Sequence, residues 1–148
     1  MELEVITKRT FKSEQEKAYN NLIYTNNWLD HQNKNFFMQY GLTQQQYNVM
    51  KVLKAHYPDP CKANALNGKL LEKTPDISRI IERLRVKGLV DRRWKEGDRR
   101  SVDIVLTNKG MGLLFKVDTE IHRLENIFMR LNNSELNALN QLLDKLRG

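Results

Sequence analysis

The chain of 148 residues has very little cysteine and no long apolar run, and both absences limit what it can be. The single cysteine, Cys61, cannot form a disulfide within the chain, so no disulfide framework is expected. No apolar stretch approaches the ~20 residues that span a bilayer, and the N-terminus has no hydrophobic segment of a secretory signal. We therefore expect a cytoplasmic protein with no membrane partner.

Catalytic and metal-binding motifs are also missing from the sequence. The three histidines, His31, His56 and His122, fall on three different predicted helices and lack the spacing of metal ligands. There is no Gly-rich phosphate loop, no HExxH motif and no nucleophile elbow. We expect no catalytic residue, no metal and no cofactor, and a function other than catalysis.

Basic residues are what the chain has in excess. The sequence holds 25 Lys and Arg against 18 Asp and Glu, a formal net charge of +7. Residues 79–100 contain nine of these cations and four acids, a net of +5. Concentrated positive charge favours polyanionic partners, so this region indicates a nucleic-acid binder. The alternative is a solvated basic surface with no partner.

Both ends of the chain have the periodicity of long helices. They are predicted in residues 13–40, 107–131 and 132–146, with Thr107 as the cap of the second and a capping box of Asn132 and Glu135 before the third. Apolar side chains recur along each helix at spacings of three and four, interrupted in the first by Asn26 and Asn33. This is more apolar surface than one small domain needs for its core, which predicts association with a second copy. The alternative is a helical bundle within one chain. The residues expected at the dimer interface are Leu22, Leu29, Val117, Ile121, Leu124, Phe128, Leu139 and Leu143.

Three shorter helices and a hairpin are predicted between these ends. The predicted helices span residues 44–56, 62–70 and 74–87. Thr43 and Gln46 form a capping box before the first of them. Thr74 is expected to cap the last, and Gly88 to end it. Its predicted buried stripe is Ile77, Ile80, Ile81 and Leu84. Two segments, 89–94 and 101–106, are predicted to be paired strands around the polar turn 95–98, and the second alternates between apolar and polar residues.

This order of elements predicts a mainly α fold with a small β-hairpin wing. It is a winged helix-turn-helix joined to a helical dimerisation region. The winged domain is expected in residues 41–107, the N-terminal helix of the dimerisation region in 1–40 and its C-terminal helices in 108–148. A helix fits the major groove of DNA, about 12 Å wide, and reads base edges with residues near its N-terminus.

The helix predicted at 74–87 is the candidate recognition helix. Its expected DNA contacts are Asp76, Ser78, Arg79 and Arg83. Arginine suits this role because its planar fork binds guanine O6 and N7 together, or a phosphate. Glu82 lies three residues from Arg79 and is predicted to hold its guanidinium. The alternative is an ordinary amphipathic helix with a solvated basic face.

The hairpin tip carries the second set of predicted DNA contacts: Lys95, Asp98, Arg99 and Arg100. We expect the three cations to enter a narrow minor groove, where negative potential is concentrated. Asp98 is expected to orient Arg100 or another arginine of the hairpin. The alternative is an exposed turn with a surface ion pair worth less than about 1 kcal/mol.

These residues resemble the MarR family of bacterial transcription regulators, and the resemblance extends over nearly the whole chain. It rests on Ile77-x-Arg79, Arg83-Leu84, Lys87-Gly88-Leu89-Val90, Asp98-x-Arg100 and Leu106-Thr107-x-x-Gly110. The resemblance implies a homodimer whose first, fifth and sixth helices interlock, with two winged domains on adjacent major grooves of a pseudo-palindrome. It also implies repression or activation of nearby genes, often relieved by a small aromatic ligand or by thiol oxidation.

The sequence-based prediction is therefore a DNA-binding, ligand-responsive repressor, with the effector and two other functions left open. Four aromatic residues are weak candidates for a pocket that binds a small aromatic effector, against plain core packing: Tyr24, Trp28, Phe36 and Phe37. Cys61 follows Pro60 at the start of the helix predicted at 62–70, where a thiol can have a lowered pKa, so a redox sensor is one alternative. A winged-helix module that binds protein or RNA is the other.

Overall fold

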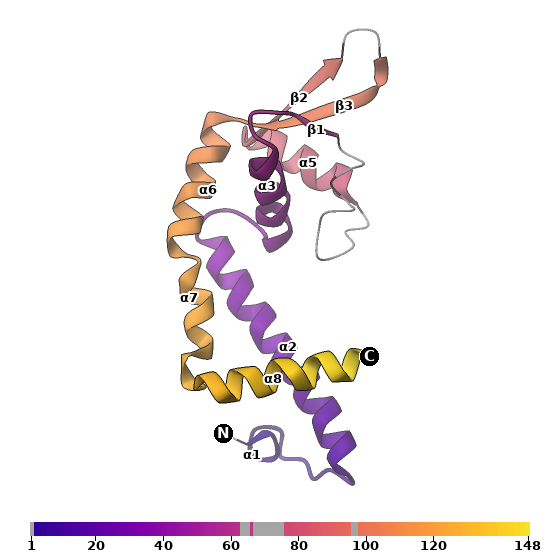
Figure 1. The fold of residues 1–148 in the computed structure, drawn as a ribbon, viewed down its shortest axis with the longest axis vertical. Coiled ribbons are helices and arrows are strands. Elements are labelled where there is room, and N and C mark those ends of the chain that lie inside the picture. Colours follow the sequence, from indigo (N-terminus) through magenta and orange to yellow (C-terminus); the bar gives the residue numbers. More distant parts are fainter. Residues whose placement is uncertain (1, 63–65, 67–75, 96–97) are drawn as a thin grey trace. The chain divides into compact units, whose positions relative to one another are not determined.

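The computed structural model describes residues 2–62, 66, 76–95 and 98–148, and gives the backbone alone for residues 94, 95 and 98–102. The chain forms two compact units, Met1–Gly41 and Leu42–Gly148 (Figure 1). Helices dominate, and one small antiparallel sheet accompanies them, which confirms the predicted fold class. Within the described ranges, no helix is long and apolar enough to cross a membrane.

The first unit consists of two helices, α1 (Leu3–Thr7) and α2 (Glu14–Met38). Ser13 begins α2 because its side chain accepts a hydrogen bond from the Glu16 amide, at 3.2 Å. The long helix predicted at 13–40 is therefore present with nearly the predicted bounds. Helix α1 was not predicted, since five residues are too few to show a helical period.

The second unit begins with α3 (Gln44–His56), whose bounds match the prediction. The capping box of Thr43 and Gln46 is present, with both hydrogen bonds at 3.2 Å. The other helical segments of this unit for which the structure gives bounds are α5 (Ile77–Val86), α6 (Asn108–Glu120), α7 (His122–Glu125), the 3-10 helix Asn126–Arg130 and α8 (Asn133–Arg147).

The sheet has three antiparallel strands in the order β1-β3-β2. They are β1 (Cys61–Lys62), β2 (Val90–Lys95) and β3 (Asp98–Leu106). Lys62, predicted to begin a helix, instead pairs with Asp103 in β3, as Cys61 pairs with Ile104. This pairing joins segments some 40 residues apart, so local periodicity could not predict it. The rest of the helix predicted at 62–70 lies outside the described residues, apart from the buried Leu66.

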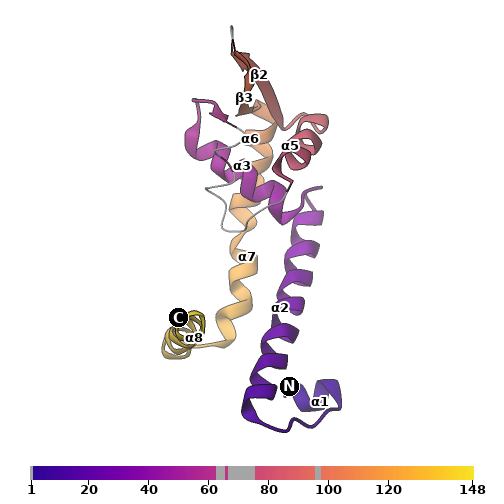
Figure 2. The ribbon, with the colours of Figure 1, turned by 90° about the vertical axis from the view of Figure 1, so that its right-hand side faces the viewer.

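The core of the second unit lies where α3, α5, α6 and the sheet meet (Figure 2). The apolar stripe predicted for the recognition helix is confirmed, because Ile77, Ile80, Ile81 and Leu84 are all buried. Helix α6 approaches the start of β2 so closely that a Cβ at Gly110 would lie 2.1 Å from the Leu89 carbonyl oxygen. Position 110 therefore requires glycine.

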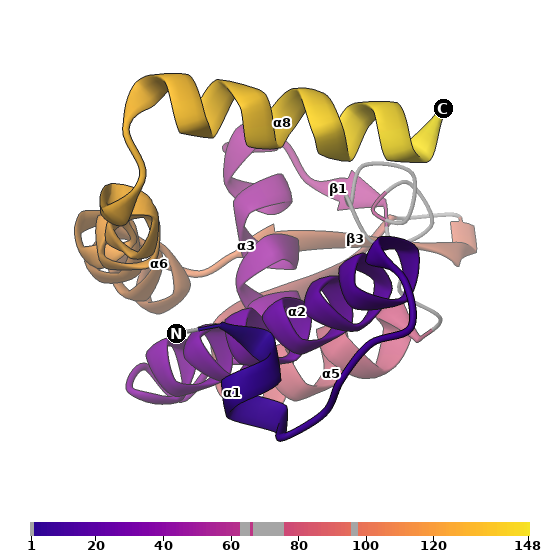
Figure 3. The ribbon, with the colours of Figure 1, turned by 90° about the horizontal axis from the view of Figure 1, so that it is seen from below.

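The helix predicted at 107–131 is one column with three successive segments. Thr107 caps α6 as predicted, by accepting a hydrogen bond from the Gly110 amide at 3.0 Å. Ile121 keeps helical dihedral angles between α6 and α7, and after α7 the backbone tightens to 3-10 geometry. The helical column therefore continues, but the spacing of its backbone hydrogen bonds changes. Helix α8 begins at the predicted Asn132 capping box and runs across the end of this column (Figure 3).

Candidate nucleic-acid interface

The recognition helix α5 is fixed at both ends by local hydrogen bonds. At its start, Asp76 Oδ1 accepts the Arg79 amide at 3.1 Å. The described helix thus begins at Ile77, and the predicted cap Thr74 lies outside the described residues. At its end, Gly88 adopts a φ of 71°, and the Leu89 amide donates to the Leu84 carbonyl at 2.9 Å. This arrangement confirms Gly88 as the helix stop.

Two arginines on the outward face of α5 are available to a ligand. Arg79 and Arg83 are four residues apart, so they lie on one side of the helix, and both are exposed. Neither guanidinium makes an ion pair or hydrogen bond with any residue that the structure describes. Ser78 is exposed beside them. Asp76 is exposed too, with its carboxylate in the helix cap, and its base contact stays a prediction.

Glu82 does not hold Arg79, and that prediction is wrong. Its Oε1 lies 2.8 Å from Nη2 of Arg85, and its Oε2 lies 3.0 Å from Nη2 of Arg92 in strand β2. Hydrogen bonds from Arg85 hold the pKa of Glu82 below its ordinary value, so the carboxylate stays charged. The pair with Arg92 links the recognition helix to the base of the hairpin.

The hairpin of β2 and β3 projects past α5 (Figures 1 and 2). Its turn is shorter than predicted, because Lys95 and Asp98 pair with each other within the strands. Trp94 pairs with Val102, so β3 has residues 99–101 as an irregularity opposite the step from Trp94 to Lys95. Arg99 and Arg100 thus belong to this bulge of β3. The side chains of all four predicted wing contacts lie outside the described ones, and their roles stay predictions.

The predicted dimer-interface residues differ in how much surface they offer. Val117 is 0% exposed, so it belongs to the core of the second unit and has no surface for another chain. Leu22 and Phe128 are exposed, at 46% and 39%. The others are half-buried: Leu29, Ile121, Leu124, Leu139 and Leu143. Helix α8 has no buried residue in the single chain.

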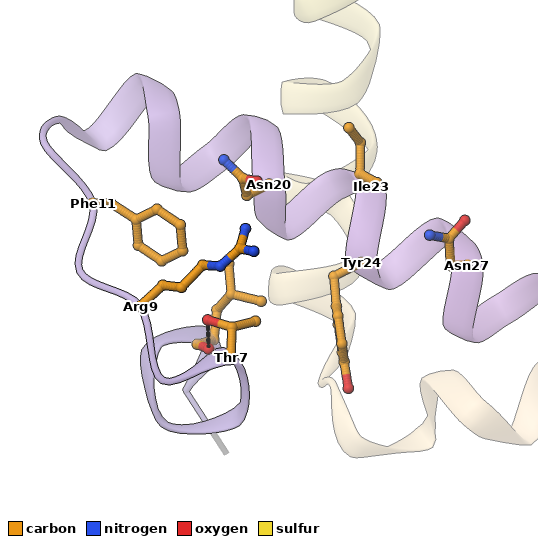
Figure 4. A pocket seen from close by; sticks show the side chains of 8 residues that line it. Thr7, Arg9, Phe11, Asn20, Ile23, Tyr24 and Asn27 are labelled. Carbon is orange, nitrogen blue, oxygen red and sulfur yellow. Dashed lines mark hydrogen bonds between the residues drawn. The ribbon is translucent and has the colours of Figure 1, made fainter.

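The four aromatic candidates for an effector pocket differ in burial, and their role stays a prediction. Phe36 and Phe37 are buried, with their rings edge to face at 5.1 Å. Trp28 and Tyr24 are each 41% exposed. Of the four, only Tyr24 lines the cavity that side chains between Leu3 and Asn27 form in the first unit (Figure 4).

Cys61 lies in strand β1 and pairs with Ile104, where the sequence predicted the start of a helix. Its side chain is 4% exposed. Thiolates that react with oxidants are partly exposed and stabilised by nearby positive charge or a helix N-terminus. The burial of Cys61 therefore does not support a redox role.

A polar cluster that the sequence did not predict joins α3 to α6. Asp118 accepts hydrogen bonds from the Tyr47 hydroxyl at 2.8 Å and from Nζ of Lys51 and Lys54 at 3.2 and 3.0 Å. Burial and the bond to Asp118 raise the pKa of Tyr47, so its hydroxyl stays protonated and donates. The cluster anchors α6 to the winged domain.

Comparison with solved structures decides the family. A MarR transcription factor from Planctomyces limnophilus is 30% identical and matches 91% of this chain and 98% of its own, with a TM-score of 0.70. The chain belongs to the MarR family. The predicted family is therefore confirmed, although no protein-family model matches the chain.

Two further solved structures share the MarR fold at lower identity. S. aureus MepR in complex with DNA is 22% identical and matches 87% of this chain and 94% of its own, with a TM-score of 0.71. An organohalide-sensing transcriptional regulator in its 2,4-dichlorophenol-bound form is 16% identical and matches 98% and 88%, with a TM-score of 0.77.

Proposed function

We propose that this MarR-family protein is a DNA-binding transcriptional regulator that binds a pseudo-palindromic operator as a homodimer. The observation that carries the proposal is the outward face of α5, where Arg79 and Arg83 are exposed and have no partner among the described residues. A helix in the major groove can place such arginines against guanine edges or phosphates. The structure of MepR with DNA shows that this fold can bind duplex DNA.

The hairpin supplies the second contact in this proposal. Lys95, Arg99 and Arg100 lie at or near the end of a hairpin that projects past α5, and we place them at the minor groove, with Asp98 orienting an arginine. The Glu82–Arg92 pair, at 3.0 Å, fixes the base of the hairpin against the recognition helix. The recognition helix and the hairpin then contact adjacent grooves of the DNA as one rigid body.

The proposal assigns dimerisation to residues 1–40 and 108–148, and DNA binding to residues 41–107. In support, Leu22, Leu142 and Leu146 expose 46%, 65% and 70% of their surface in the single chain. Apolar surface of this extent on neighbouring helical turns is typical of an association site. A two-fold dimer would set its recognition helices about one turn of DNA apart, ~34 Å.

We further propose a non-enzymatic repressor that acts in the cytoplasm and releases its operator when a small aromatic effector binds. Support comes from the organohalide-sensing regulator of the same fold, which holds 2,4-dichlorophenol.

Binding to duplex DNA at several salt concentrations tests the proposal. Affinity should fall steeply with salt, because each neutralised phosphate releases counterions. Arg79→Ala should lose about 1–3 kcal/mol on the preferred sequence, while Arg123→Ala, an exposed arginine on α7, should lose nothing. A flat salt dependence with no preference for duplex would instead support the protein- or RNA-binding module.

A further inference from the structure

Val86 is the last residue of the recognition helix α5 and one of the most exposed apolar side chains that the structure describes, at 74%. At 3.6 residues per turn, it lies about 170° round the helix from the centre of the buried stripe, so it points almost directly away from the core. Positions 79, 83 and 86 fall within about 60° of one another. Val86 therefore shares the outward face of α5 with Arg79 and Arg83.

Local physical chemistry does not favour valine at this position. A β-branched side chain loses rotamer freedom in a helix, and straight-chain polar residues have a higher helix propensity. An apolar side chain in water also gains none of the free energy of burial. Single exposed apolar residues are common on protein surfaces, but this one is aligned with the two arginines that carry the proposed function. A partner in the DNA would account for an apolar group there.

The side chains beside Val86 have partners elsewhere. Nζ of Lys87 donates to Oε1 of Gln46 in α3, at 3.1 Å. One turn earlier, Oε1 of Glu82 lies 2.8 Å from Nη2 of Arg85, which compensates the charge of the acid. The isopropyl group of Val86 is therefore left to the solvent in the free protein, beside a carboxylate whose repulsion of DNA is reduced.

The C-terminal end of α5 holds this isopropyl group in a fixed place. The Gly88 amide donates to the Arg85 carbonyl at 2.8 Å. The Thr107 hydroxyl, at the start of α6, donates to the Gly88 carbonyl at 2.7 Å and ties the helix end to the core. Valine has one strongly preferred rotamer in a helix. A group that packs against Val86 therefore costs little side-chain entropy.

The base edges in the major groove present one apolar group, the C5-methyl group of thymine. Next to it, Arg79 and Arg83 would hold guanine edges or phosphates. Seven residues of α-helix rise about 10.5 Å, and successive nucleotides of one strand are about 3.4 Å apart. Val86 can therefore reach a base up to about three base pairs from the one that Arg79 contacts.

We propose that Val86 reads one thymine in each half-site of the operator, by packing its isopropyl group against the C5-methyl group in the major groove. This contact distinguishes thymine from cytosine, which has no methyl group, and makes Val86 a specificity-determining residue. The inference rests on the proposed function, because it needs α5 in the major groove. It deepens that function by naming a base that the helix reads without a hydrogen bond.

Replacement of thymine by deoxyuridine tests the contact, because the two bases differ only in the methyl group. The probe is the duplex that the wild-type protein selects from random DNA, with each thymine of a half-site replaced in turn. At one position, within about three base pairs of the base that Arg79 reads, wild-type affinity should fall about fourfold for each methyl group removed. Val86→Ala should lose less than twofold there, since its contact with the methyl group is already gone.

Val5→Ala is the matched control, because Val5 is 64% exposed and lies on α1, in the other unit. It should keep the fourfold loss of the wild type. Circular dichroism shows whether both variants are folded. The contact is overturned if the wild type and Val86→Ala lose the same affinity at every thymine. It is also overturned if the wild type responds to no methyl group in its selected site.

This contact and the proposed function fail in different ways. A wild-type protein that selects inverted half-sites but ignores every methyl group keeps the proposed function and loses the contact at Val86. A wild-type protein that selects no duplex loses both, because the contact exists only in the major groove.

Discussion

Asp118 keeps a negative charge in a site that is only 20% exposed. Burial alone would raise its pKa, but hydrogen bonds from Lys54, Tyr47 and Lys51 outweigh that effect and lower the pKa below its ordinary value of 3.8. The folded state therefore binds the proton of Asp118 less readily than the unfolded state. Its contribution to stability is complete above pH 3.8 and is lost as pH falls through the lower, folded-state pKa.

Asp118→Asn should therefore destabilise the protein at pH 7 and have a smaller effect at a pH well below 3.8. The expected loss at neutral pH is about 1–3 kcal/mol, because hydrogen bonds to a charged acceptor are removed. Urea unfolding at both pH values measures it. Asp144→Asn is the control, since this exposed carboxylate pairs with Arg147 on the surface of α8 and should change little at either pH. An equal loss at both pH values would contradict the assignment.

Glu82 sets how much positive charge the recognition helix presents. Glu82→Gln should free Arg85 and Arg92, strengthen binding to random-sequence duplex and steepen its salt dependence by about one phosphate contact. Filter binding across a salt series measures both. Glu120→Gln, which breaks a comparable surface pair with Arg123 on α7, should leave both unchanged. Indistinguishable behaviour of the two variants would show that Glu82 has no special role.

At the scale of single residues, the sequence could predict which side chains are exposed but not which partners they have. Helical periodicity placed Ser78, Arg79 and Arg83 outward, as the structure has them. Arg79 and Arg85 are both three residues from Glu82, so spacing could not choose between them. Arg92, which reaches Glu82 from a strand, is a tertiary contact that no local pattern contains.

At the scale of elements, the contact between α6 and the start of β2 depends on one glycine. A Cβ at position 110 would meet the Leu89 carbonyl oxygen at 2.1 Å, and backbone cannot move aside as a flexible side chain can. Gly110→Ala should therefore cost about 1–3 kcal/mol or more through forced displacement of α6. Thermal unfolding measures the loss.

Gly112 is the matched control on the same helix, because a Cβ there meets nothing within 4 Å. Gly112→Ala should be neutral or should stabilise α6 by up to about 1 kcal/mol, through the higher helix propensity of alanine. Destabilisation of equal size in the two variants would mean that the close approach at Gly110 is not the cause.

Elements whose starts are set by local hydrogen bonds could be predicted from the sequence. Elements that form by pairing between distant segments of the chain could not. The capping boxes at Thr43 and Asn132 gave the starts of α3 and α8 correctly. Strand β1 was missed because it exists only through its pairing with β3. The hairpin turn was predicted to be longer than it is. The bulge at residues 99–101 shifts the register of pairing between β2 and β3, and no simple alternation in the sequence indicates this shift.

At the scale of the whole molecule, α8 indicates that the single chain is one subunit of an oligomer. It has no buried residue, and Leu142 and Leu146 are 65% and 70% exposed. The sequence correctly predicted that the helices at the ends of the chain carry more apolar surface than a single chain buries. It placed Val117 at the interface wrongly, because a seam of apolar residues does not show which members face the chain's own core.

The double variant Leu143→Lys, Leu146→Lys should be monomeric at micromolar concentration, since two buried charges would oppose an apolar interface. Sedimentation equilibrium compares it with the wild type and with Gln141→Lys, an exposed position on the opposite face of α8 that should leave the dimer intact. A monomeric wild type, or a double variant that still dimerises, would contradict the assignment of α8 to the dimer.

Selection of bound sequences from random duplex DNA tests the central claim most directly. A dimer that presents two α5 helices should enrich two inverted half-sites with centres about 10–10.5 base pairs apart, the spacing of one helical turn. Arg79→Ala should relax the preference at one position in each half-site. Recovery of no sequence above the input pool, or of one unsymmetrical site, would contradict this account of how the molecule binds DNA.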